Sequence, residues 1–400
     1  MAEPQYKPSP RSLPRAAVLR QLSALARDRV SLRDAQGEVA FGSGGGLAAS
    51  IEVRDPRFYE RCLNEGSLGA AESFLAGEWT CDDLTALFRI LVRNESVMDA
   101  MESALTRAAL SIARAAFALR RNTTSGSSRN IAEHYDLGND FFRLFLDETL
   151  TYSCGIFEST GSSMQEASVA KIDGLCRKMA LGPADHLLEI GTGWGAFAIH
   201  AARNFGCRVT TATISRQQYE VACERIAEAG LGGRVKVLLE DYRELRGSFD
   251  KLVSVEMIEA VGREYLDLYF QVCRDRLKPG GAMALQAILM AEQRYEGYCG
   301  RVDFIQKYVF PGSHLPSPGA IAGSARAAGL DISEREDITP HYAETLRRWR
   351  AEFWNRIEEV RKLGYSERFI RMWHYYFCYC EAGFEERNTM TEQMLLVRSR

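Results

Sequence analysis

The chain has 400 residues, more than a typical single domain of ~100–200 residues, so we expect two domains. Hydrophobic residues make up 46% of the chain and charged residues 26%, the composition of a soluble globular protein. The net charge of −3 gives no support for a nucleic-acid partner. The ten cysteines and six histidines form no C-x-x-C or H-x-x-x-H pair, so we expect no metal site. Most of the cysteines are expected to be buried thiols in a reducing cytoplasm.

The N-terminal region is basic and is interrupted by prolines. Residues 1–30 contain two acidic side chains and six basic ones, namely Lys7, Arg11, Arg15, Arg20, Arg27 and Arg29. Such a segment is either a solvated tail or an arm attracted to an anionic membrane surface, where each basic residue near the lipid contributes about 1 kcal/mol. Both interpretations stay open on the sequence alone.

Short β-like runs and turn glycines follow in residues 36–87, including the glycines of Gly66–Gly69. The pattern then becomes mostly helical over Leu91–Leu119. A basic stripe of three arginines spaced seven apart lies on one face of this helical pattern, formed by Arg107, Arg114 and Arg121. The stripe could lie in a membrane interface or be an ordinary solvated face.

Polar and small residues at 120–128 break the helical pattern and mark a linker. We therefore predict an N-terminal domain over residues 1–119, a linker over 120–128 and a larger domain over 129–400. No transmembrane segment is expected, since the most apolar stretch, Met101–Leu119, is interrupted by charges and lacks the ~20 apolar residues that a span needs.

Strand and helix patterns alternate beyond the linker. Helical patterns lie at Arg216–Ala229 and Tyr265–Leu277. The predicted strands are Leu187–Ile190, Arg208–Thr213, Val235–Glu240, Lys251–Val255 and Ala282–Ala287. Alternation of this kind predicts an α/β fold in which helices cover both faces of a parallel sheet.

A glycine-rich turn, Glu-Ile-Gly-Thr-Gly-Trp-Gly at residues 189–195, follows the first of these strands and precedes a helical pattern. Open α/β sheets bind nucleotides at this position, and glycines let the backbone approach a ligand closely. The spacing is G-x-G-x-G, whereas pyrophosphate binders have G-x-G-x-x-G. The turn therefore favours S-adenosylmethionine (SAM), although an ordinary strand-to-helix turn is the alternative.

Polar residues follow the next strands at the same predicted edge. Thr213 and Gln218 offer a hydroxyl and an amide to a ribose or carboxylate, Asp241 could accept from an adenine amine, and Tyr242 could stack on the ring. The fourth strand ends in a segment that carries two carboxylates, Glu256 and Glu259. Together with the glycine turn, these positions predict a SAM site.

Several motifs resemble those of the cyclopropane-fatty-acyl-phospholipid synthases, a family that includes the mycolic-acid cyclopropane synthases. The resemblance extends over nearly the whole chain. It lies in the segments Glu65–Ser73, Gly77–Asp82, His134–Phe142, Leu150–Phe157, Ala170–Asp173, Asp303–Gly312 and Trp373–Phe377. The first two segments resemble the accessory domain of the bacterial phospholipid enzymes, which the mycolic enzymes lack.

The resemblance implies a class I SAM-dependent methyltransferase, with a Rossmann-like, mostly parallel sheet and a smaller N-terminal accessory domain. It also implies a homodimer at the cytoplasmic face of the membrane, associated peripherally, that acts on unsaturated phospholipid. The residues expected to bind SAM are Tyr152, Ser153, Glu189, Gly191, Gly193, Gly195, Thr213, Gln218, Asp241 and Tyr242.

The implied reaction adds a methylene from SAM across a cis double bond of an acyl chain. Methyl transfer leaves a carbocation, which needs a dry pocket and aromatic faces, and a base then removes a proton so that the ring closes. In the resembling family this base is a bound bicarbonate. The positions that would hold it are Cys154, Glu259, Gln286, Ile288 and Tyr376.

Two positions depart from the common family pattern. Ala260 and Gln286 stand where many members have histidine. A neighbouring subgroup of the family carries the same alanine and glutamine. A glutamine amide can donate a hydrogen bond but cannot carry positive charge, so the anion site should be less positive. Loss of a different proton would give a methyl- or methylene-branched chain instead of a ring. A non-catalytic lipid-binding protein and a methyltransferase for soluble substrates are the remaining alternatives.

Overall fold

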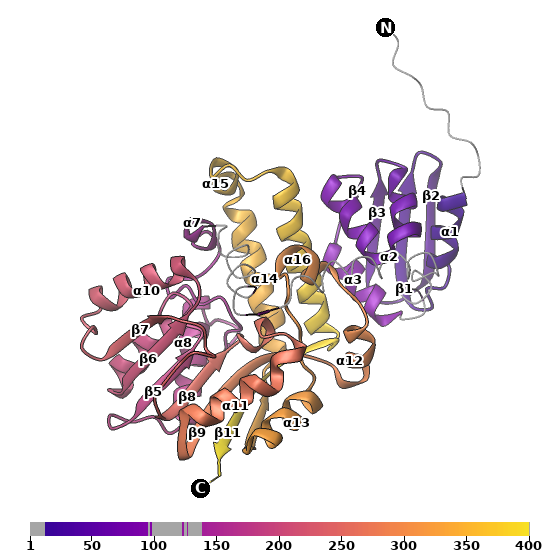
Figure 1. Ribbon diagram of the computed structural model, residues 1–400. Coiled ribbons are helices and arrows are strands. Elements are labelled where there is room, and N and C mark those ends of the chain that lie inside the picture. The colour runs from indigo at the N-terminus through magenta and orange to yellow at the C-terminus, as the bar shows by residue number, and fades with distance from the viewer. Residues whose placement is uncertain (1–12, 95–96, 98–121, 124–125, 127–137, 400) are drawn as a thin grey trace. The chain divides into compact units, whose positions relative to one another are not determined.

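The computed structural model describes residues 13–94, 97, 122–123, 126 and 138–399, which form two compact units (Figure 1). The first unit takes its described residues from Met1–Ala116, Arg301–Phe304 and Tyr365–Glu386, and the second from Phe117–Gly300, Ile305–Gly364 and Arg387–Arg400. Residues 365–386 thus pack with the N-terminal residues, whereas the predicted ranges of 1–119 and 129–400 assign them to the catalytic domain. The stripe of Arg107, Arg114 and Arg121 lies outside the described residues, as do residues 134–137 of the segment His134–Phe142, which is called the first family motif below. The segment Leu150–Phe157 is called the second family motif.

The first unit contains a four-stranded sheet in the order β2-β1-β3-β4. Strands β1 and β3 are parallel, and the other two neighbouring pairs are antiparallel. The bounds are α1 Leu13–Leu22, β1 Asp28–Asp34, β2 Gly37–Gly44, β3 Ala48–Val53, α2 Arg57–Ala76, β4 Trp79–Cys81 and α3 Leu84–Arg93. The predicted β runs of residues 36–87 are therefore confirmed in part, because α2 and the first turn of α3 lie in the same range.

The predicted turn at Gly66–Gly69 lies inside helix α2. Gly66 nevertheless leaves the helical conformation, with φ 59° and ψ −133°, and kinks α2 there. The basic N-terminal arm is also shorter than expected, because residues 13–22 form helix α1. Arg15 of α1 pairs with Asp34 at 2.6 Å, so this arginine belongs to the folded unit and not to a solvated tail.

Helix α16, Glu367–Glu385, packs on α2 and α3 within the first unit. The Tyr375 ring lies 4.8 Å from Phe88 of α3. Glu386, at the end of α16, accepts hydrogen bonds from the guanidinium groups of Arg89 and Arg93 at 2.7 and 2.8 Å. A segment near the C-terminus thus completes the core of the N-terminal unit.

The second unit is built on a seven-stranded sheet in the order β10-β11-β9-β8-β5-β6-β7. Its strands are β5 His186–Ile190, β6 Arg208–Thr213, β7 Val235–Leu239, β8 Phe249–Val255, β9 Leu277–Met290, β10 Leu330–Asp337 and β11 Thr389–Arg398. All five strands predicted from the sequence are confirmed, although β9 is longer at both ends than expected. Strands β5 to β9 run parallel, and β11 is antiparallel to both of its neighbours.

Helices connect the strands of this sheet. Two of them, α10 and α11, lie within one residue of the predicted helices. The helix bounds are α7 Asn139–Phe142, α8 Met164–Lys178, α9 Ala196–His200, η1 Ala201–Phe205, α10 Arg216–Glu228, η2 Ile258–Ala260, η3 Arg263–Tyr265, α11 Leu266–Arg276, α12 Glu292–Cys299, η4 Ile305–Val309, α13 Pro318–Ala328, α14 Thr339–Asn355 and α15 Ile357–Lys362. None of the helices in the part of the chain that the structure describes is long and apolar enough to span a bilayer.

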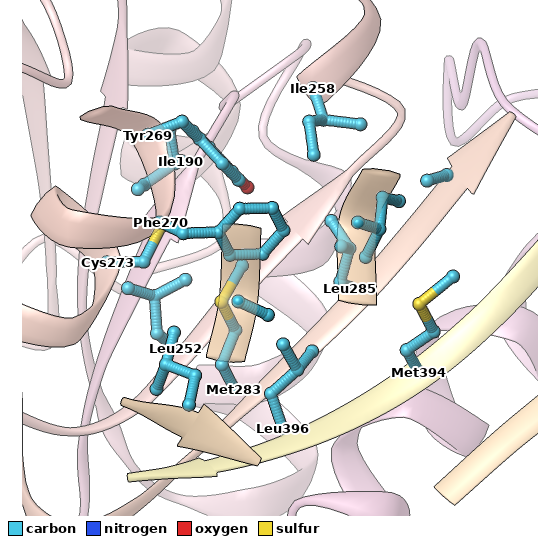
Figure 2. Packing of buried hydrophobic residues seen from close by; sticks show 14 of the residues in the cluster. Ile190, Leu252, Ile258, Tyr269, Phe270, Cys273, Met283, Leu285, Met394 and Leu396 are labelled. Atoms are coloured by element: carbon cyan, nitrogen blue, oxygen red, sulfur yellow. The ribbon is translucent and has the colours of Figure 1, made fainter. Parts of the chain in front are cut away.

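Alternating residues of each strand enter separate hydrophobic clusters on the two faces of the sheet. Leu252 of β8 packs with Tyr269, Phe270 and Cys273 of α11, as Figure 2 shows. Its neighbour Val253 belongs to the opposite cluster, with residues of α8, α9 and α10. Helices therefore cover both faces, as the sequence predicts, and the sheet edge at the ends of β5 and β8 carries the polar residues.

Candidate active site

The glycine-rich turn joins β5 to α9 in the left-handed backbone region. Gly191, Gly193 and Gly195 have φ values of 101°, 51° and 87°. A Cβ at Gly191 would lie 3.3 Å from Met257 Cβ, and a Cβ at Gly195 would lie 3.4 Å from Ala222 Cβ. A Cβ at Gly193 would meet no atom within 4 Å. Gly191 and Gly195 therefore allow Met257 and Ala222 to pack against the turn. At Gly193 the backbone has no side chain next to it, so a ligand can approach it closely.

Neighbouring elements hold this turn in place. Gly191 N donates to Ala212 O of β6 at 3.0 Å, and the hydroxyls of Thr192 and Thr211 lie 2.7 Å apart. Arg225 of α10 donates through Nη1 to the carbonyl oxygens of Thr149 and Trp194, at 2.8 and 2.9 Å. This arginine, which the sequence did not single out, joins the turn to the segment that enters the second family motif.

Thr213 and Gln218 come together at the end of β6. Thr213 Oγ1 donates to Gln218 Oε1 at 3.0 Å, and both residues are buried. Ser215 caps α10, because its side chain accepts a hydrogen bond from Gln218 N. The short distance from strand end to helix start fixes both predicted side chains at the expected edge of the sheet.

Asp241 and Tyr242 follow β7, as predicted, but their side chains have protein partners. Both carboxylate oxygens of Asp241 accept from Arg243, at 2.8 and 2.7 Å. The Tyr242 ring lies 5.6 Å from Tyr269, at the edge of the hydrophobic core. The adenine contacts of these two residues stay a prediction, and Arg243 is an additional polar group at the site.

A buried lysine lies beneath the second family motif. Lys171 of α8 donates through Nζ to Ser153 Oγ at 2.9 Å and is 2% exposed. Burial lowers the pKa of Lys171, and the nearby Glu256 carboxylate opposes that shift. Burial also raises the pKa of Glu189 to about 8, against the Thr211 hydroxyl and the Lys171 charge. One positive charge thus lies among several buried acidic groups.

Tyr152 belongs to an aromatic cluster. Its ring centroid lies 5.2 Å from Phe142 and 5.2 Å from Trp349 of α14. Trp194 of the glycine turn lies 5.2 Å from the same Phe142 ring and donates through Nε1 to Asn139 Oδ1 at 2.7 Å. The cluster joins the two family motifs to the glycine turn. Trp349, far along the chain, carried no sequence signal for this role.

Glu256 is the centre of the polar network at the ends of β8 and β9. Its Oε1 accepts from Cys154 N at 2.9 Å and from Gln286 Nε2 at 2.8 Å. Its Oε2 accepts from the Tyr342 hydroxyl of α14 at 2.6 Å. Burial raises the pKa of Glu256, and these hydrogen bonds and Lys171 oppose the shift. The sequence placed a carboxylate here but did not predict its partners.

The backbone at Glu256 is strained. Its φ of 48° lies in the left-handed region, which residues with a Cβ enter at a cost of about 1–3 kcal/mol. Helix α14 also holds the adjacent motif, because Thr345 Oγ1 accepts from Gly155 N and His341 Nδ1 accepts from Phe157 N, both at 3.2 Å. The hydrogen bonds of the Glu256 carboxylate to Gln286 of β9 and to Cys154 of the second family motif hold this residue in place, so the strained backbone persists.

Glu259 and Ile288 are also brought together, as predicted. Ile288 N donates to Glu259 Oε1 at 2.5 Å, whereas Glu259 Oε2 is buried and has no hydrogen-bond partner among the described residues. Burial, together with repulsion from Glu256, raises the pKa of Glu259 to about 8. Tyr376, the fifth predicted residue, lies on α16 in the first unit.

A bicarbonate ion does not fit the donor set of the second unit. The N–H of Cys154 and the amide of Gln286 already donate to Glu256, and the N–H of Ile288 donates to Glu259. An ion on these donors would displace the carboxyl groups of Glu256 and Glu259 and would add a further negative charge beside them. Burial of like charges without compensation is strongly unfavourable.

The fold and the glycine turn define a SAM-dependent methyltransferase. In the strand order, β6 and β7 lie on one side of β5 and β8 and β9 lie on the other, so the direction of strand addition changes between β5 and β8. Gly191 follows β5 and Glu256 follows β8 at this point. Ligands bind at such switch points in open α/β sheets.

Comparisons with known proteins identify the family. The family model for mycolic acid cyclopropane synthetase matches residues 122–394. Tuberculostearic acid methyltransferase UfaA1 of Mycobacterium tuberculosis is 38% identical over 90% of this chain and 86% of its own. Cyclopropane-fatty-acyl-phospholipid synthase of Escherichia coli is 36% identical over 88% of this chain and 89% of its own. The chain therefore belongs to the cyclopropane synthetase family of SAM-dependent methyltransferases.

A solved structure agrees with this assignment. Mycolic acid cyclopropane synthase CmaA1, complexed with SAH and CTAB, superposes with a TM-score of 0.64 at 30% identity. The match covers 68% of this chain and 98% of that chain. The relatives from Mycobacterium tuberculosis and Escherichia coli match a larger share of this chain, 90% and 88%.

The first prediction concerns Gly193. Replacement by Val should reduce SAM affinity by at least about 100-fold, because a branched side chain would fill the space that the bare backbone leaves open. Isothermal titration calorimetry measures the affinity. Gly230→Val is the matched control, since Gly230 also has a positive φ, 70°, with no atom within 4 Å of its Cβ. Equal SAM affinity in both variants would refute the placement.

A second prediction concerns Glu189. A carboxyl whose pKa rises from 4.5 to about 8 on folding destabilises the protein increasingly as pH rises through that interval. Glu189→Gln removes this charge, so its Tm relative to wild type should increase by a few °C between pH 5 and pH 8, about 2–4 °C per kcal/mol for a domain of this size. Thermal unfolding without SAM measures the change. The exposed Glu228→Gln should show no such trend, and a flat difference for Glu189→Gln would contradict the assignment.

Proposed function

We propose that this enzyme transfers the methyl group of SAM to a cis double bond in an unsaturated phospholipid acyl chain and that the product is a cyclopropane fatty acid. SAM supplies an electrophilic methyl group on a sulfonium. The glycine turn with Thr213, Gln218 and Asp241 would hold this cosubstrate. The observation that carries the proposal is the buried aromatic and carboxylate site at the switch point, in a chain similar over its length to a cyclopropane-fatty-acyl-phospholipid synthase.

The aromatic cluster fits the proposed chemistry. An alkene is a weak nucleophile, so it must be held in line with the methyl group. The resulting carbocation would be captured by water, and the rings of Tyr152, Trp194 and Trp349 can stabilise it without reacting. Phe142 is 1% exposed, which supports a site from which water is excluded.

A methyl- or methylene-branched product is the second candidate. Its support is the 38% identity to a relative named as a tuberculostearic acid methyltransferase, together with the departures at Ala260 and Gln286. Both candidates share methyl transfer to a mid-chain alkene. They differ in the fate of the acyl cation. Loss of a proton from the transferred methyl group closes the ring, and loss of a proton from a chain carbon gives a methyl-branched alkene. A methylene branch forms when a hydride first shifts from the methyl-bearing carbon to the cationic carbon and a methyl proton is then lost.

The decisive experiment is expression in a bacterial host rich in monounsaturated phospholipid. Fatty acids from the phospholipid fraction should gain 14 mass units, the mass of one CH2 group, and proton NMR should show the high-field signals of a ring. Olefinic methylene signals, or the signal of a branch methyl group without ring signals, would instead establish the branched alternative. Methyl-labelled SAM that labels only soluble compounds would refute both candidates.

We further propose that the enzyme reaches its substrate by reversible docking to anionic membrane surfaces. Basic residues outside the described chain support this proposal, namely Lys7 and Arg11 and the stripe of Arg107, Arg114 and Arg121. Attraction of this kind weakens as salt shortens the Debye length, which is about 10 Å at 0.1 M.

The third prediction tests docking by removal of residues 1–12. This deletion spares α1 and its Arg15–Asp34 ion pair, so the first unit keeps its described contacts. Sedimentation with anionic vesicles should fall about five- to thirtyfold with the loss of Lys7 and Arg11, since each contributes about 1 kcal/mol. Added salt should weaken binding of the full chain. Equal sedimentation with neutral and anionic vesicles would rule out electrostatic docking.

A further inference from the structure

We propose that Glu256 is the anion of this active site, in place of an exogenous bicarbonate, and that Glu259 Oε2 accepts the proton from the acyl cation. This inference rests on the proposed function for the proton-transfer step. Its first part, occupation of the anion-binding groups by a carboxylate of the chain, holds for any substrate.

Glu256 is held where it stands by groups from four parts of the chain. Cys154 N, Gln286 Nε2 and the Tyr342 hydroxyl lie 2.6–2.9 Å from its carboxylate oxygens, and Lys171 provides a nearby positive charge. Two of the three donors belong to residues that the family resemblance assigns to bicarbonate. A carboxylate has the planar oxygen pair of bicarbonate, so it can satisfy the same donors.

The departure at Gln286 fits this arrangement. Its Nε2 donates to Glu256 Oε1 at 2.8 Å, and its Oε1 accepts from Gln393 Nε2 of β11 at 2.9 Å. The amide is fixed by both neighbours in a single orientation, with its N–H groups toward the carboxylate. A neutral donor suffices here because Glu256 accepts three hydrogen bonds, and Lys171 also favours its ionised form.

Glu259 has the geometry of a proton acceptor. Its Oε1 is held by Ile288 N, and its Oε2 accepts no hydrogen bond among the described residues, although the side chain is buried. An unpartnered buried carboxylate oxygen is costly to maintain, and a catalytic role is one of the reasons for which such a group is kept. Repulsion from Glu256 increases the proton affinity of Glu259, which suits a general base.

The proton transfer balances without another reagent. One C–H bond of the methylated acyl cation breaks, and its proton forms an O–H bond with Glu259 Oε2. The electron pair of that C–H bond moves to the cationic carbon. It closes the ring if the proton leaves the transferred methyl group, and it forms a double bond if the proton leaves an adjacent chain carbon. The proton then passes to solvent before the next turnover.

The first test measures anion binding without a lipid substrate. Wild-type enzyme with S-adenosylhomocysteine should show no saturable binding of 13C-labelled bicarbonate by NMR. Glu256→Gly should bind it, because the change frees the Cys154 and Gln286 donors and suits the backbone, whose φ is 48°. Glu381→Gln, which alters a buried carboxylate in the first unit, should behave as wild type. Saturable bicarbonate binding by the wild type would overturn the inference.

The second test measures methyl transfer to phospholipid in buffer freed of carbon dioxide. Wild-type turnover should not change on addition of bicarbonate. Glu256→Gly should lose about tenfold or more in turnover, because removal of the resident anion lowers the proton affinity of the Glu259 base, and it should recover with bicarbonate or formate. Glu256→Gln fills the same space with an amide and should not be rescued.

Glu259→Gln should lose about 100-fold or more in turnover with SAM affinity unchanged within about threefold, because its role is proton transfer. Full activity of this variant, or a bicarbonate requirement in the wild type, would overturn the inference. If Glu256→Gly does not fold, the wild-type bicarbonate dependence still decides. Failure of wild-type enzyme to methylate lipid, with the anion-binding result intact, would refute the proposed function and not the role of Glu256.

Discussion

The hydrogen bonds of one buried carboxylate connect the elements of this active site. Glu256 joins the end of β8 to β9 through Gln286, to α14 through Tyr342, and to the second family motif through Cys154. Its burial is tolerable because donors surround both oxygens and Lys171 lies nearby. Removal of any one donor would leave part of a buried charge uncompensated, which costs more than the bond itself contributes.

This network depends on the parallel sheet. Because β5, β8 and β9 run in the same direction, Gly191 after β5 and Glu256 after β8 lie at one edge of the sheet, where Gln286 of β9 pairs with Val255 at the end of β8. Hydrophobic clusters on both faces hold the strands in register, and α11 covers one face with Tyr269, Phe270 and Cys273 (Figure 2). The apolar core therefore fixes the positions of polar groups that would otherwise repel one another.

The two units differ in how far the sequence pattern predicts them. The second unit has the complete methyltransferase sheet, and the first adds a small sheet whose helices pack with α16 from near the C-terminus. The sequence pattern alone suggested a simple division at residues 120–128. Helix α16 has a strongly apolar face whose partner cannot be deduced from local periodicity, since the residues it contacts on α3 lie almost 300 positions earlier.

The sequence by itself determined the sheet, the glycine turn and the family, because these depend on local features. Alternating apolar runs specify strands and helices, and a positive φ specifies glycine at Gly191, Gly193 and Gly195. Only the tertiary structure decided which groups meet at the site. The bond from Cys154 to Glu256 spans 102 positions, and Trp349 reaches Tyr152 from α14. Such contacts arise from chain topology, so a residue pattern that names a carboxylate and an amide does not reveal that they bind each other.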